Sequence, residues 1–192
     1  MTEFFGWSNK NKMIYLQSDR LIIRSFRETD LEAFSAYRSD PDVAKYQSWE
    51  LPYKMDQAFL FLADINRFKP GTPGEWYQLA VERQGQPGII GDVAFQINRD
   101  DPLQAEIGFT FDRSFQNQGY ATEAVKNLLN FLFTQMNLHR VVAICDVENH
   151  ASVRLLERIG MRREGHFIEN VWFKGSWGCE YLYAILSSEW DK

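Results

Sequence analysis

The hydrophobic pattern of this chain changes its period near residue 75, and that change limits the folds available to it. Apolar residues between Met55 and Phe68 recur every three or four positions, which is typical of an amphipathic helix. A run of helix breakers from Pro70 to Gly74 ends this pattern, and from Trp76 onward apolar and polar residues alternate. Helical segments followed by an alternating, turn-rich stretch predict a mixed α/β domain that contains an antiparallel meander.

The rest of the sequence extends this mixture of helices and strands. Helices are expected over residues 29–39, 55–68, 120–136 and 151–159, the first opening at a Thr29–Glu32 capping box. Strands are expected over residues 21–23, 76–82, 89–97, 105–111, 141–147, 162–168 and 180–186, with a turn at 175–178 between the last two. Residues 105–147 should form a right-handed parallel crossover. We therefore expect a mixed, mostly antiparallel sheet with one parallel strand–helix–strand unit and helices on both faces.

Composition narrows the class of protein further. The chain has 192 residues and a net charge of −5, and we expect an N-terminal arm over residues 1–15 followed by one domain over 16–192. An acidic chain without a basic stripe does not suit nucleic-acid binding, and no apolar run approaches the ~20 residues that span a bilayer. Cys145 and Cys179 are the only cysteines and lack metal-ligand spacing, which predicts reduced thiols, no metal site and a cytoplasmic protein.

One strand–loop–helix segment carries the clearest functional signal. The strand over 105–111 leads into a polar loop, and the helix that follows begins with small residues. The first turn of a helix has unpartnered N–H groups and a partial positive charge, so it can bind a pyrophosphate. Gly119 and Ala121 would let the phosphate approach the backbone closely. The loop matches neither the GxxxxGK[ST] nor the GxGxxG pattern, and alone it also suits an ordinary strand–helix turn.

Together with its flanks, this segment resembles the GNAT superfamily of N-acetyltransferases. The hexapeptide Gln116-Asn117-Gln118-Gly119-Tyr120-Ala121 is similar to the family's Q/R-x-x-G-x-G/A signature for coenzyme A. Residues 119–124, 138–141 and 149–161 resemble the branch that contains the ribosomal-protein N-terminal acetyltransferases. The resemblance covers roughly residues 16–190. It implies an acetyl-CoA-dependent transfer of an acetyl group to a primary amine, on a small molecule or a protein N-terminus.

The resemblance also implies where coenzyme A binds. Backbone amides of residues 118–122 would hold the pyrophosphate, and the main chain of 109–111 would pair with the pantetheine while the strand over 141–147 splays away. Asn149 would hydrogen-bond the pantetheine, and Arg158 would suit the 3′-phosphate, unless it is only a solvated charge on a helix. The residues assigned to coenzyme A are Phe109, Thr110, Phe111, Gln116, Asn117, Gln118, Gly119, Tyr120, Ala121, Thr122, Asn149, Ser152, Leu155 and Arg158.

Direct attack of an amine on the thioester needs a base, an oxyanion donor and an acid for the leaving sulfur. A backbone N–H of residues 109–111 is the expected oxyanion donor. Many relatives carry a Tyr seven positions after the Asn, but here that position is Leu156. Ser152 is therefore the expected acid, the alternative being a helix-terminal serine that bonds only to backbone.

Glu106 is the expected base, because it lies on the strand assigned to the cofactor. Asp92, Glu169 and a chain of waters are the alternatives. Some members of the resembled family have a Glu near the position that Val171 occupies here. This chain lacks that Glu, so the identity of its general base stays open.

Aromatic residues mark the expected acceptor pocket. Tyr46, Trp49 and Trp172 are assigned to it, since aromatic walls can hold an alkyl or peptide chain beside the amine, although core or dimer contacts would explain them equally well. The alternative function is a non-catalytic acyl-CoA-binding sensor or structural module. The sequence leaves the acceptor unnamed and a homodimer open.

Overall fold

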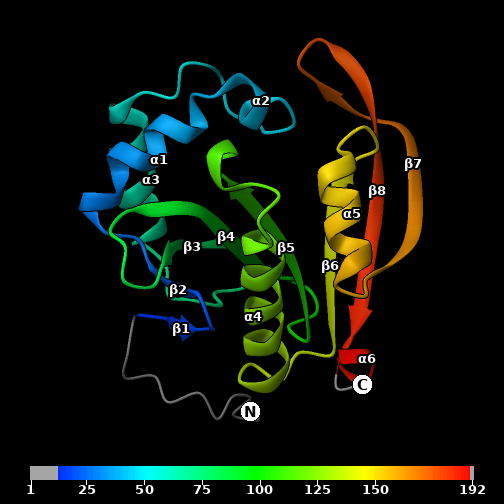
Figure 1. Ribbon diagram of the computed structural model, residues 1–192. Helices are drawn as coiled ribbons and strands as arrows, with labels where there is room; N and C mark the ends of the chain where they lie inside the picture. The colour runs from blue at the N-terminus through cyan, green and yellow to red at the C-terminus, as the bar shows by residue number, and fades with distance from the viewer. Residues whose placement is uncertain (1–12, 191–192) are drawn as a thin grey trace.

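The computed structural model describes residues 13–190 and arranges its strands as one eight-stranded sheet (Figure 1). The strands are β1 (Tyr15–Gln17), β2 (Leu21–Ser25), β3 (Trp76–Arg83), β4 (Ile89–Ile97), β5 (Gln104–Phe111), β6 (Arg140–Asp146), β7 (Arg162–Phe173) and β8 (Ser176–Leu186). Their order in the sheet is β1-β2-β3-β4-β5-β6-β8-β7. β5 and β6 are parallel and the other neighbours are antiparallel, which confirms the expected sheet.

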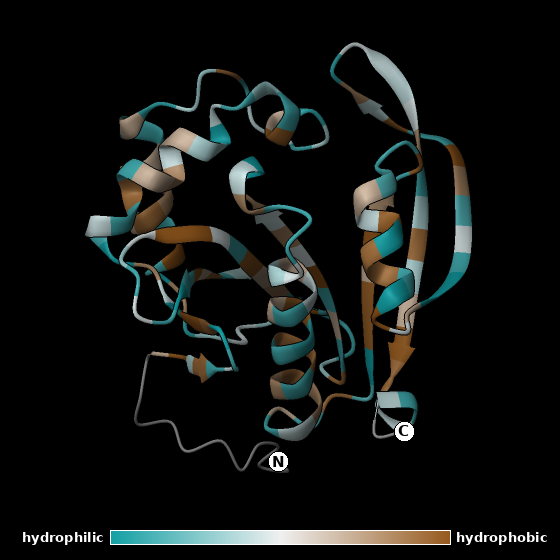
Figure 2. Ribbon diagram, viewed as in Figure 1, coloured by the Kyte–Doolittle hydropathy of each residue, from teal (hydrophilic) through white to brown (hydrophobic). Residues whose placement is uncertain are grey.

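Helices cover both faces of this sheet, as expected. They are α1 (Leu31–Arg38), α2 (Pro41–Ala44), α3 (Met55–Ile65), α4 (Tyr120–Thr134), α5 (His150–Arg158) and α6 (Ser187–Trp190), with 3-10 turns η1 (Glu28–Asp30) and η2 (Arg113–Phe115). Along β3, Leu79 and Val81 face a core shared with α4 and α5, whereas Ala80 faces α1 and α3. The apolar stripe of α4 is buried, and its outward face is mainly hydrophilic in Figure 2. Each buried leucine stabilises this packing by about 1.5–3 kcal/mol.

The sheet begins earlier in the sequence than expected. Most of the arm expected over residues 1–15 lies outside the described residues, but Ile14 and Leu16 are buried in the larger core and β1 pairs with β2. Among the described residues, no helix is long and apolar enough to cross a membrane.

The first helix does not open at the expected capping box. α1 begins at Leu31, after η1, and the capping box lies at η1 instead: the Asp30 carboxylate accepts the backbone N–H of Arg27 at 2.7 Å. The same carboxylate also pairs with the guanidinium of Arg24 on β2, at 2.7 and 2.9 Å. This ion pair joins residues only six positions apart, but it connects a strand to the start of a helix and matches no helix-capping spacing.

The hairpin of β7 and β8 is longer than expected, and its turn is tighter. Lys174 and Gly175 form the turn with φ values of 47° and 90°, the two left-handed residues that a type I′ hairpin turn requires. The turn expected over 175–178 is therefore wrong. Trp172 and Trp177 instead oppose each other across the two strands. Lysine is an unusual residue for the first left-handed position, which hid the turn.

Candidate functional site

The parallel strands β5 and β6 pair only at their bases. Their register consists of Gln104 with Arg140, Ala105 with Val141 and Glu106 with Val142. The other edge of β5 stays paired with β4 up to Phe111. Within the described part of the chain, residues 107–111 of β5 therefore have no strand partner on the β6 side. Such an edge can pair with an extended ligand through its backbone N–H and C=O groups.

Two cavities occupy the space where the strands diverge. The larger, of about 330 Å³, is bounded by β5, the loop before α4, the first turn of α4, α5 and the α2 segment. The smaller, of about 130 Å³, lies between β5 and β6, lined by residues 107–109 and 143–146 among others. This smaller cavity, which we call the slit, therefore lies along the gap that opens between the two strands. The two cavities adjoin, since both are lined by Tyr46, Gln47, Phe109, Asn149 and Ser152.

The loop before α4 leaves the first turn of that helix open to a ligand. Gly119 is the residue that precedes the helix, with φ 82°, and no side chain caps the helix there. Asn117 is also left-handed, with φ 58°. The Gln118 carboxamide turns away and donates to the Ser114 carbonyl at 2.8 Å. The first turn of α4 therefore faces the larger cavity with unused N–H groups, the arrangement that binds a phosphate.

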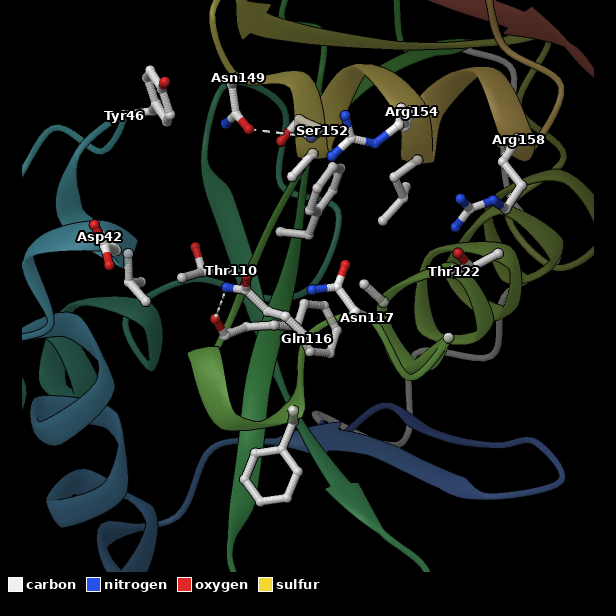
Figure 3. Close-up of a pocket in the computed structure, with 18 of the residues that line it drawn as sticks. Asp42, Tyr46, Thr110, Gln116, Asn117, Thr122, Asn149, Ser152, Arg154 and Arg158 are labelled. Carbon is white, nitrogen blue, oxygen red and sulfur yellow. Dashed lines mark hydrogen bonds between the residues drawn. The ribbon is translucent and has the colours of Figure 1, made fainter.

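α5 forms the opposite wall of the larger cavity. The Asn149 side-chain oxygen accepts the backbone N–H of Ser152 at 3.1 Å and so caps the helix. Among the described residues, the Ser152 hydroxyl has no hydrogen-bond partner. Arg154 and Arg158, one turn apart, both line the larger cavity; in Figure 3 the Arg158 guanidinium extends toward Thr122, whereas that of Arg154 lies nearer Ser152. The spacing of these two arginines on one helix face is a signal that could have identified Arg154 from sequence.

Most residues assigned to coenzyme A from the sequence do gather at this cavity. The exceptions are Gln118, described above, and Tyr120, whose ring lies under the guanidinium of Arg20 at 4.5 Å. The cavity also has lining residues that sequence reasoning did not identify, namely Asp42, Val43, Gln47, Phe115, Ala151 and Arg154. Three of these come from the α2 segment, which only the tertiary fold brings to β5.

The expected base, Glu106, lies at the base of the divergence and lines neither cavity. Burial raises the pKa of its carboxyl group, and the nearby charge of Glu180 raises it further. Of the alternatives, Asp92 is fully buried and accepts hydrogen bonds from Tyr37 and Gln78. Glu169 is exposed on β7.

The aromatic residues assigned to the acceptor occupy three different settings. Tyr46 lines both cavities, and its hydroxyl donates to the Glu148 carbonyl at 3.0 Å, across the mouth of the space. Trp49 packs in the smaller core and donates to the Arg38 carbonyl at 2.9 Å, the setting of a core residue. Trp172 is 60 % exposed and packs against Trp177 at the hairpin tip, outside both cavities. Only Tyr46 is placed beside the space that a ligand would fill.

Comparison with known proteins shows which family the chain belongs to. Residues 20–162 match the acetyltransferase (GNAT) domain family. The chain is 36 % identical to the uncharacterised N-acetyltransferase YnaD of Bacillus subtilis, over 93 % of this chain and all of that protein. It is 23 % identical to the ribosomal protein uS5 alanine N-acetyltransferase of Escherichia coli, over 97 % of each.

Solved structures agree with this grouping. The crystal structure of a GNAT-family acetyltransferase from Bacillus anthracis superposes with a TM-score of 0.81 at 34 % identity, over 92 % of this chain and all of that one. Spermidine N-acetyltransferase from Vibrio cholerae, in complex with CoA and spermine, gives 0.76 at 25 % identity, over 91 % and 100 %. The sequence, the diverging strands and the uncapped helix all lead to one assignment: the chain belongs to the GNAT family and is an N-acetyltransferase.

Proposed function

We propose that the donor is acetyl-CoA and that it binds where β5 and β6 diverge. One observation carries this proposal: the unpaired edge of β5 leads directly to the uncapped first turn of α4, within one cavity. The backbone of residues 118–122 would hold the pyrophosphate, and the edge of 109–111 would pair with the pantetheine. Arg154 and Arg158 would bind the adenosine phosphate from the opposite wall, where guanidinium groups suit phosphate oxygens.

Ser152 is the proposed acid. It lines both the donor cavity and the slit, and its hydroxyl is free of competing hydrogen bonds within residues 13–190. It can therefore supply a proton or a hydrogen bond to the sulfur that leaves as the amine nitrogen bonds to the carbonyl carbon. Leu156, beside it in the slit, has no proton to give.

The proposed acceptor is a primary amine, on a small molecule or a protein N-terminus. Support comes from relatives whose names state a ribosomal-protein alanine and spermidine as acceptors. Gly108 and Ile144 line the slit, and the amine would reach the thioester through it. Tyr46 lines both the larger cavity and the slit, so of the three aromatic residues it is the one best placed to contact the acceptor.

The test is thiol release from acetyl-CoA across a panel of N-terminal peptides, polyamines and aminoglycosides, with Ser152→Ala assayed beside the wild type. We expect turnover with one class of amine, and a loss of kcat by tenfold or more in the variant, about 1.4 kcal/mol of barrier. CoA binding, measured by calorimetry, should change little. If the wild type binds CoA but releases no thiol with any amine, the chain is instead an acyl-CoA-binding module.

Glu106 is the proposed base; because it lines neither cavity it would act through an intervening water, and its elevated pKa makes a pH prediction. A carboxyl group accepts a proton only when ionised, so kcat/KM should rise with pH through a limb above the usual glutamate range. Glu106→Gln should remove that limb and lower the plateau by about 100-fold. The profile is measured from pH 5 to 9, with the exposed Glu32→Gln as the matched control. A Glu106→Gln profile identical to wild type would assign the proton to a water chain instead.

A further inference from the structure

The turn between β1 and β2 is bonded to the first turn of α4, more than 100 residues away. Ser18 Oγ and the backbone N–H of Arg20 donate to Glu123 Oε1 at 2.8 and 2.9 Å, and Arg20 Nε donates to Oε2 at 2.6 Å. Arg20 Nη1 also donates to the Gln118 carbonyl at 3.1 Å. One side chain thus holds both the loop before α4 and the helix itself, and its guanidinium covers the ring of Tyr120.

The turn that carries Arg20 is itself fixed from its other side. The backbone N–H of Gln84 donates to the Arg20 carbonyl at 2.9 Å, and the Gln84 carboxamide donates to the carbonyls of Ser18 and Asp19. The backbone N–H of Ser18 donates to the Leu21 carbonyl at 3.0 Å. Arg20 therefore extends from a bonded turn, so its position relative to α4 is set by the sheet.

The position of Glu123 creates an electrostatic problem for the proposed donor. This carboxylate lies in the first turns of the helix whose N-terminus is assigned to the pyrophosphate. Burial acts to raise the pKa of Glu123, but the bonds from Arg20 and Ser18 lower it below its usual value, so the group is ionised at neutral pH. An uncompensated negative charge there would oppose an anionic ligand. The ion pair with Arg20 cancels that charge.

We propose that Arg20 and Glu123 are positioning residues for the pyrophosphate of the donor. The pair holds the Gln118–Gly119 backbone beside the cavity and removes the charge that would oppose phosphate binding. Arg20 lines neither cavity, so it acts through the loop and through Glu123. The proposal rests on the acetyl-CoA site proposed above, and it concerns donor affinity alone.

The test compares two donors that differ in the phosphates. Arg20→Ala should raise KM for acetyl-CoA and the calorimetric Kd for CoA about tenfold, with kcat changed less than about twofold. KM for S-acetylpantetheine, which lacks the pyrophosphate and the nucleotide, should stay within about twofold of wild type. Arg67→Ala is the matched control, because Arg67 forms an exposed ion pair with Asp64 at 3.2 Å, far along the sequence from the loop. It should leave both donors unaffected.

A second variant separates charge cancellation from mechanical bracing. Adding Glu123→Gln to Arg20→Ala removes the uncompensated carboxylate and should recover about threefold of the lost CoA affinity. If Arg20 only holds the loop in place mechanically, the double variant should bind CoA no more tightly than Arg20→Ala. Arg20→Lys keeps the charge without the two-pronged geometry, and we expect its CoA affinity within about threefold of wild type.

Three results would overturn the proposal: unchanged CoA affinity in Arg20→Ala, equal losses for both donors, or no recovery in the double variant. Failure of the wild type to bind CoA would instead overturn the donor assignment itself. Circular dichroism melts of each variant show that the comparison is made between folded proteins.

Discussion

Replacing Arg24 by methionine is expected to lower the free energy of unfolding by about 3–5 kcal/mol, because it strands buried carboxylates without a counter-charge. The Arg24 side chain is 5 % exposed and pairs with Asp30, 4 % exposed, and with Glu82, 18 % exposed. Methionine fills a similar volume but supplies none of the N–H donors. The carboxylate of Asp30 would keep only the backbone N–H of Arg27. Urea unfolding followed by circular dichroism measures the loss.

Two further variants test whether the loss of stability comes from the unpaired buried carboxylate. Arg67→Met removes an exposed ion pair and should change stability by no more than about 0.5 kcal/mol. Adding Asp30→Leu to Arg24→Met removes the stranded charge and should recover part of the loss. A change below 1 kcal/mol in the single variant would mean that water reaches Asp30 in the folded protein, contrary to its burial.

Gly91→Ala should lower the free energy of unfolding by about 3 kcal/mol and weaken CoA binding at the same time. An ideal Cβ at Gly91 would lie 2.4 Å from the Thr110 carbonyl oxygen and 2.9 Å from the Phe111 Cα. Both atoms belong to the β5 backbone, which cannot move aside as a flexible side chain can. Gly91 and Phe111 are register partners, so the methyl group must push β5 out of its place in the wall of the proposed donor site.

Gly108→Ala is the matched control for this effect on stability. Gly108 also lies in the sheet, but the nearest atom to its ideal Cβ is a ring carbon of Trp76 at 3.9 Å, an ordinary contact. Its free energy of unfolding should stay within about 1 kcal/mol of wild type, with a small gain from the lower entropy of the unfolded chain. Equal losses in the two variants would contradict a steric cause at Gly91.

The parts of the fold and site that follow from local sequence could be predicted. α4 shows its apolar stripe directly, and the loop from Gln116 to Ala121 combines small residues with a helix start in consecutive positions. The strands of the meander alternate because one face of each packs in the larger core, as Leu79, Phe95 and Ile107 do. The pairing of β5 with β6, and its early end, could be expected once the family resemblance was seen.

The remaining parts depend on contacts between distant segments. Asp42 and Gln47 reach the donor cavity only because α1 places the α2 segment beside β5. The Arg20–Glu123 pair joins residues 103 positions apart, and neither residue belongs to a local pattern that predicts its partner. The aromatic residue Trp49 resembled a pocket residue in sequence, yet it packs in a core, since composition does not tell which apolar surface a ring will cover.

The hairpin of β7 and β8 forms one edge of the sheet. β7 is the last strand of the sheet and pairs with β8 alone, while the donor groups lie on β5, α4 and α5 (Figure 1). Most β7 side chains are exposed, so substitutions there leave the pairing of β4 with β5 intact. The outer strand can therefore accept new side chains without disturbing the strand pairing that shapes the larger cavity.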